Sequence, residues 1–176
     1  MKILLNNQVI TTVNSIEELN MFLSHYEFLI DDIQFDQDEY KSLYESEKLQ
    51  KLSAHIYSKY PQEKQAQDER WVSSFSTKLK AADIHNLESV VVGVVLDLAN
   101  NTLEQSVKNV VAGLSDDVIN KINKPNKTQR KQFITDALTK LVKIALRSEW
   151  LEDCITEGKT AIEENREPVY AVFPEL

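Results

Sequence analysis

The feature that most constrains this fold is a long helical repeat of apolar residues in the last third of the 176-residue chain. The repeat starts after Thr128, and its spacing of three or four residues places the apolar side chains on one face of an α-helix. It continues to Ile162, and its first members are Phe133, Ile134, Ala137, Leu138 and Leu141. Because such a face needs other helices to cover it, we expect a mainly α-helical protein that folds as a helical bundle.

Helical patterns also occur earlier in the chain. Ser15, with glutamate three residues later, forms a capping box and predicts a helix that runs to Tyr26. A long helix is expected over 38–60, because apolar residues recur near one side and Pro61 ends the pattern. A third helical stripe follows at Trp71, Phe75 and Leu79, and Asn86 is placed to cap the next element.

The stretch Leu87–Ala99 is apolar on nearly every side and fits either a fully buried helix or a central strand. We favour the helix, since its leucine and valine residues also follow a helical spacing. Strands are expected elsewhere, at Met1–Leu5 and Val9–Val13 as a hairpin around Asn6-Asn7-Gln8, at Phe28–Phe35, and at Pro168–Pro174, where the strand would pair with the hairpin. The sequence thus predicts a small acidic α+β part over 1–61 and a helical part over 62–176.

Two structures compete just before Ser115. The short apolar run Val110–Leu114 reads as a strand that leads into a helix started by Ser115-Asp116-Asp117 and ended near Pro125. However, Thr102 begins a second capping-box pattern, and Gly113 is placed to end a helix that would begin there. Both interpretations of this segment stay open at the level of sequence.

If the segment is a strand, residues 105–145 read as short strand, short helix, basic turn and amphipathic helix. This order resembles the ribbon-helix-helix family of dimeric DNA-binding proteins, most closely in Thr-x-Arg-x-x-Phe-Ile-x-x-Ala-Leu from Thr128. The resemblance implies a homodimer whose paired strands enter the major groove of operator DNA. The DNA-binding residues that it implies are Lys108, Asn109, Val111, Lys127, Thr128, Arg130 and Lys131.

The net charge of −8 is spread unevenly along the chain. Residues 14–47 hold ten acidic side chains and one basic, whereas residues 121–147 hold eight basic and one acidic. Such asymmetry indicates either partners of opposite charge or two faces that dock on each other. The candidate partner-binding acids are Asp31, Asp32, Asp36, Asp38 and Glu39.

Other classes of function find little support in the composition. Three glycines are too few for a nucleotide-binding loop, and the three histidines are isolated from one another, so we expect no enzyme, no cofactor and no metal site. No apolar run approaches the ~20 residues of a membrane span. The single cysteine, Cys154, cannot form an internal disulfide and suits a reducing cytoplasm.

We therefore expect a non-enzymatic cytoplasmic regulator of the antitoxin type. Its 105–145 segment would bind operator DNA, and its acidic N-terminal surface would bind a basic protein partner, a toxin or a nuclease. The alternative is an immunity protein or inhibitor that neutralises such a partner by protein binding alone, without DNA. The two hypotheses differ in whether residues 107–114 are extended and paired with a second copy.

Overall fold

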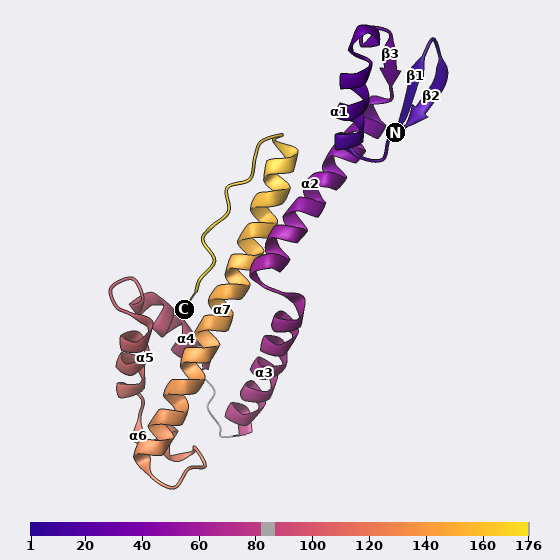
Figure 1. Cartoon of the computed structure of the whole chain (residues 1–176). Helices are drawn as coiled ribbons and strands as arrows, with labels where there is room; N and C mark the ends of the chain where they lie inside the picture. The colour runs from indigo at the N-terminus through magenta and orange to yellow at the C-terminus, as the bar shows by residue number, and fades with distance from the viewer. Residues whose placement is uncertain (82–86, 176) are drawn as a thin grey trace. The chain divides into compact units, whose positions relative to one another are not determined.

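The structure is a computed structural model that describes residues 1–81 and 87–175. Within these residues it contains seven α-helices and a three-stranded antiparallel sheet near the N-terminus (Figure 1), which confirms the expected fold class. The chain divides into two compact units. The sheet unit comprises Met1–Ser58 and Cys154–Tyr170, and the helical unit comprises Lys59–Asp153 and Ala171–Leu176.

The sheet unit opens with the expected hairpin. Its described strands lie in the order β2-β1-β3, with bounds β1 (Lys2–Leu5), β2 (Gln8–Thr12) and β3 (Ile33–Phe35). Asn6 and Asn7 connect the first two strands with φ values of 48° and 63°. Positive φ at both central residues is what a type I′ turn requires, and asparagine tolerates it better than most residues.

Helix α1 (Ile16–His25) begins at the predicted capping box. Ser15 Oγ accepts the Glu18 N–H at 3.0 Å, and the Glu18 carboxylate accepts the Asn14 N–H at 2.7 Å. The buried side chain of Leu19 joins Ile3 and Val13 in the small core between this helix and the sheet. Local capping and burial of one helical face therefore agree here, as the sequence predicted.

The strand expected over Phe28–Phe35 is wrong in its first half. Glu27–Leu29 forms a 3₁₀ turn, η1, and only Ile33–Phe35 is strand β3. Turn hydrogen bonds, such as Leu29 N–H to the Tyr26 carbonyl at 2.9 Å, use backbone groups that a strand would need for pairing. The two aspartates that follow the turn also have low β-propensity.

Helix α2 (Gln37–Lys59) confirms the predicted long helix. In the sheet unit it contacts the last turns of α7 (Lys127–Glu163) through Gly158, where an added Cβ would lie 2.5 Å from Leu52 Cδ2. Because Leu52 is buried, it has little room to move aside. Glycine therefore sets how closely these two helix segments approach.

Helix α7 ends in a Schellman motif. Asn165 adopts a φ of 50°, and the Arg166 N–H donates to the Ala161 carbonyl at 2.9 Å. The terminal strand expected over Pro168–Pro174 is wrong, because residues 167–175 belong to no helix or strand. Proline lacks the N–H that a sheet ladder needs, and side-chain contacts hold this tail instead.

The helical unit packs its helices around one core. The described elements are α3 (Gln62–Ala81), α4 (Leu87–Asp97), α5 (Leu103–Ala112), α6 (Asp116–Asn120) and α7 as far as Asp153. The apolar face predicted after Thr128 is confirmed, since Ile134, Ala137, Leu138 and Leu141 are buried and Phe133 is partly buried. These residues fill the core of a single chain.

The other expectations for this unit have mixed outcomes. Trp71 and Phe75 stack with ring centroids 4.9 Å apart, as the helical stripe predicted. Residues 87–97 are helical as we favoured, but α4 is not buried on all sides, because Val92 and Leu96 are 50% and 71% exposed. The predictions for the Leu79 side chain and for Asn86 as a cap lie outside the described parts of the chain.

The segment that the sequence left open is helix α5. Thr102 Oγ1 accepts the Gln105 N–H at 3.3 Å, and the Gly113 N–H donates to the Asn109 and Val110 carbonyls. Val107 and Val111 are buried on one face, at the i, i+4 spacing of a helix. The strand interpretation is therefore wrong for this segment, because capping and one-sided burial both favour the helix.

A buried polar cluster lies inside the helical unit. Asp68 accepts hydrogen bonds from Arg147 Nη2 at 2.9 Å and from the Tyr60 hydroxyl at 3.2 Å. Burial, and secondly the charge of Asp68, raise the pKa of Tyr60. In the same unit, Trp150 Nε1 donates to the Ala171 carbonyl at 2.9 Å and so holds the tail.

Candidate protein-binding surface

The entire net charge of the protein lies on the sheet unit. This unit holds fourteen acidic and six basic side chains, a net charge of −8, whereas the helical unit holds fourteen of each. The opposed charge blocks of the sequence therefore become one strongly acidic unit and one neutral unit. A field of one sign favours association with a body of the opposite sign.

The basic block over 121–147 is largely used inside the helical unit. Five of its eight basic side chains contact an acid, a carbonyl or an aromatic ring of the same unit. Arg147 pairs with Asp68, Lys127 with Asp116, Arg130 with the Lys124 carbonyl, Lys124 with the Phe133 ring and Lys140 with the Trp71 ring. Cations that already have such partners are less available to DNA phosphates.

The residues implied for DNA reading do not form a ribbon. Val111 is 4% exposed within α5 and contributes to the core, which contradicts its assigned role in the DNA interface. Lys108 pairs with Glu104 one helical turn away, and Asn109 Nδ2 donates to Asp97 Oδ2 at 3.0 Å. A helix separates side chains by about 100° per residue, so the alternating outward face expected of a strand is lost.

The phosphate-binding residues proposed at the second helix lie on the first turn of α7. That helix begins one residue before Thr128 and is capped by Asn126, whose Oδ1 accepts the Gln129 N–H at 2.9 Å. Thr128 and Lys127 are exposed, and Arg130 and Lys131 are partly exposed. The structure therefore places these four residues together on one helical turn, but the strand that would bind DNA beside them is absent, because that segment is helix α5.

Three of the five predicted partner-binding acids lie together at the start of α2. Asp36 Oδ1 accepts the N–H groups of Asp38 and Glu39, each at 2.9 Å, and so caps the helix. Glu39 Oε2 accepts the Lys2 N–H at 3.0 Å. These acids line a shallow hollow of about 660 Å³ with Met1 and Leu43. Asp36 and Glu39 thus also stabilise the fold.

Asp31 and Asp32 lie elsewhere, in the turn that precedes β3. Both are exposed. The chain between Asp32 and Asp36 is mostly strand, so their backbones are separated by about 13 Å at the usual rise of a β-strand. The predicted acidic site is therefore two groups at opposite ends of β3.

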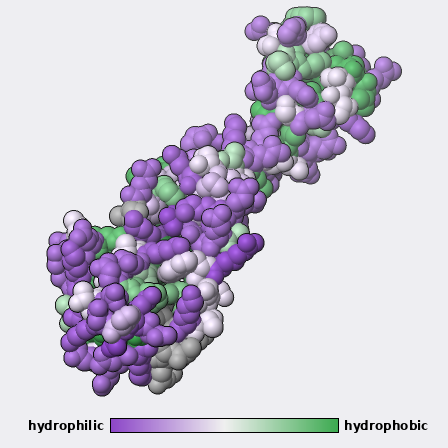
Figure 2. Space-filling model, turned by 60° about the horizontal axis from the view of Figure 1, so that its bottom comes forward, coloured by the Kyte–Doolittle hydropathy of each residue, from purple (hydrophilic) through white to green (hydrophobic). Residues whose placement is uncertain are grey.

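The structure adds an apolar cluster that the sequence did not reveal. Phe28 is 80% exposed, and Met21, Tyr26 and Ile30 are between 43% and 53% exposed. Figure 2 shows apolar side chains, in green, that interrupt the hydrophilic surface of the sheet unit. The sequence signal for this cluster was the apolar run Phe28-Leu29-Ile30 beside two aspartates. We assigned that run to a strand, in which side chains alternate between the two faces and part of the run would be buried.

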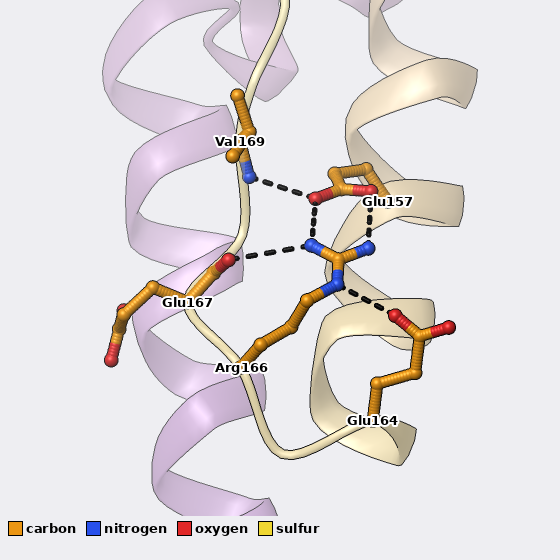
Figure 3. Close-up of polar contacts among 5 residues, drawn as sticks. All are labelled: Glu157, Glu164, Arg166, Glu167 and Val169. Carbon is orange, nitrogen blue, oxygen red and sulfur yellow. Dashed lines mark hydrogen bonds and ion pairs between the residues drawn. The ribbon is translucent and has the colours of Figure 1, made fainter.

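A further charged cluster holds the tail in the sheet unit (Figure 3). Arg166 forms paired bonds to Glu157 at 2.6 and 3.1 Å and a third bond to Glu164 at 2.6 Å, and Glu157 also accepts the Val169 N–H at 2.8 Å. These bonds lower the pKa of Glu157 to about 2, with Arg166 the largest cause. The arrangement is a latch between α7 and the tail that follows it.

Neither a metal-binding cluster nor a membrane span is found among residues 1–81 and 87–175. No group of three or more histidine, cysteine, aspartate or glutamate residues is placed there to hold a metal ion. No helix in those ranges is long and apolar enough to cross a membrane. No protein-family model, curated protein or solved structure matches this chain.

Proposed function

We propose that this protein is a non-enzymatic binding protein whose sheet unit docks onto a basic surface of a protein partner. One observation carries the proposal: the whole net charge of −8 lies on this unit, while the helical unit is neutral. Opposite charges accelerate association and disfavour partners of like charge. Basic surfaces of this kind occur on proteins that handle nucleic acid, so the partner class is a nuclease or a toxin, and the function is inhibition in a cytoplasmic setting.

DNA binding is not included in this proposal. The resemblance to ribbon-helix-helix proteins depends on a strand before Ser115, and those residues form α5. A gel shift with DNA from upstream of the coding sequence, at low salt, checks this choice. A specific shift that the substitution Arg130→Ala abolishes would return DNA binding to the function.

The test of protein binding uses purified basic ribonucleases and deoxyribonucleases as probes. Asp31→Lys with Asp32→Lys reverses two exposed charges without removing the helix cap at Asp36. The matched control is Glu149→Lys with Glu152→Lys, two exposed acids of the helical unit. We expect inhibition of nuclease activity that weakens with salt and is lost in the first variant alone.

Two results would contradict the proposal. The first is equal loss of inhibition in both double variants, because the effect would then follow total charge and not the sheet unit. The second is inhibition that 0.5 M salt leaves unchanged, since exposed charges are strongly screened at that ionic strength.

A further inference from the structure

The apolar cluster around η1 is concentrated in ten residues of the chain. Four of its side chains, Met21, Tyr26, Phe28 and Ile30, are each more than two-fifths exposed. Single exposed apolar side chains are ordinary on protein surfaces, but apolar side chains in contact with one another mark an interaction site more often, and the rings of Tyr26 and Phe28 are in such contact. Phe28 stands out because 80% of its surface is open to solvent.

Ring contacts and backbone hydrogen bonds order the part of the cluster that carries Tyr26 and Phe28. The Tyr26 ring lies 4.7 Å from the Phe22 ring and 6.3 Å from the Phe28 ring. Backbone bonds close the turn on both sides, from Leu29 N–H to Tyr26 and from Asp32 N–H to Leu29, each at 2.9 Å. A side chain presented on such a turn loses little conformational entropy when it binds.

Acidic residues border the exposed rings. Glu27 precedes Phe28 directly, and Asp31 and Asp32 follow Ile30, and all three are exposed. Anionic phospholipid headgroups would repel these carboxylates, which argues against a membrane as the binding surface. A second copy of the chain is also disfavoured, because each sheet unit carries −8. Charge complementarity therefore selects a basic protein.

From these observations we infer that Phe28 is the anchor of the interface and inserts into an apolar pocket whose rim carries lysine or arginine. This inference rests on the proposed function and deepens it by naming the part of the partner that is recognised. The two kinds of residue have separate roles. Glu27, Asp31 and Asp32 speed the encounter, whereas Phe28 slows dissociation, as buried aromatic anchors do.

The experiment uses a phage-displayed library of random twelve-residue peptides, selected on the full chain. We expect the recovered peptides to combine lysine or arginine with an aromatic or aliphatic residue. Their dissociation should be about 30-fold faster from Phe28→Ala, as for a typical hot spot. The matched control Val169→Ala removes another exposed apolar side chain of the sheet unit, 79% exposed, and should leave dissociation unchanged.

Two variants show that the readout concerns binding and not folding. Phe28→Ala should have nearly the same melting temperature as the wild type, because the side chain is mostly exposed. Phe22→Ala, by contrast, should have a clearly lower one, because Phe22 packs against the core of Ile3, Val13 and Leu19.

The possible failures are distinguishable. Basic peptides that lose binding to Asp31→Lys with Asp32→Lys but bind Phe28→Ala normally would overturn the anchor and leave the proposed function standing. Selected peptides without basic residues, or an empty selection, would overturn both. Phe28-dependent co-sedimentation with phosphatidylcholine vesicles, stronger than peptide binding, would replace the protein pocket with a lipid surface.

Discussion

At the scale of single residues, several acids in the sheet unit have structural roles. Asp36 caps α2, Glu39 holds the β1 backbone and Glu157 binds Arg166 in the latch. Of these three, Glu157 has a pKa that its partners lower, with Arg166 the largest cause, so its ion pair contributes most to the fold while the carboxylate is ionised. The stability of the latch is therefore linked to pH through Glu157.

Glu157 gives the sharpest test of this link. Its pKa is about 2 in the folded chain and about 4.5 when unperturbed, so its contribution is complete above pH 4.5 and is lost as the pH falls towards 2. Glu157→Gln should melt below the wild type at pH 6, and the difference should vanish near pH 2. Circular dichroism melts between pH 2 and pH 6 measure it. Glu163→Gln, on the same helix and exposed, is the control, and a pH-independent difference for Glu157→Gln would contradict the latch.

At the scale of elements, helix α5 decides between the two interpretations of its segment. Val111 is buried and the adjacent Ala112 is exposed. Val111→Lys should therefore cost at least ~3 kcal/mol, because it buries a charge, whereas Ala112→Lys should change stability by less than ~0.5 kcal/mol. Urea denaturation of both variants makes the comparison. The reverse order would favour the strand, in which Ala112 would face the core.

The close contact between α2 and α7 depends on the absence of a side chain at Gly158. An added Cβ at Gly158 would meet Leu52 Cδ2 at 2.5 Å and Cδ1 at 2.7 Å, so Gly158→Ala should destabilise the protein by about 1–3 kcal/mol. Combined with Leu52→Ala it should cost less than the sum of the single changes, because the clash disappears. Denaturant unfolding of all four proteins in the cycle measures this. If the two free-energy changes were strictly additive, Gly158 and Leu52 would not be in contact, which would contradict the close approach of the two helices.

The sequence was a good guide where a local signal and burial agreed. The capping boxes at Ser15 and Thr102 both start helices, and the paired asparagines at 6 and 7 form the hairpin turn. It was a poor guide where long-range contacts decide. The tail after Arg166 is held by Glu157 and Trp150, which lie 9 and 21 residues before their partners in the chain, and η1 presents Phe28 through a turn that no apolar periodicity reveals.

At the scale of the whole molecule, we expect the stability of the two units to respond differently to salt. The sheet unit has fourteen acidic groups and only six basic ones, so its excess carboxylates repel one another, and added salt screens this repulsion. Trp71 and Trp150 both belong to the helical unit, so their fluorescence reports that unit alone. Raising NaCl from 0.02 to about 0.3 M should raise the melting temperature measured by circular dichroism more than that measured by fluorescence. Identical shifts would mean that the chain responds as one electrostatic body.

The structural roles of Asp36 and Glu39 have an evolutionary consequence. In a lineage that lost its partner, these two carboxylates would persist, because selection for a folded chain would maintain them without any recognition. Asp31, Asp32 and Phe28 have no such structural role, so their identities would change freely. Coordinated change at those three positions, matched by change in a co-inherited protein, is therefore the genetic trace that recognition at this surface would leave.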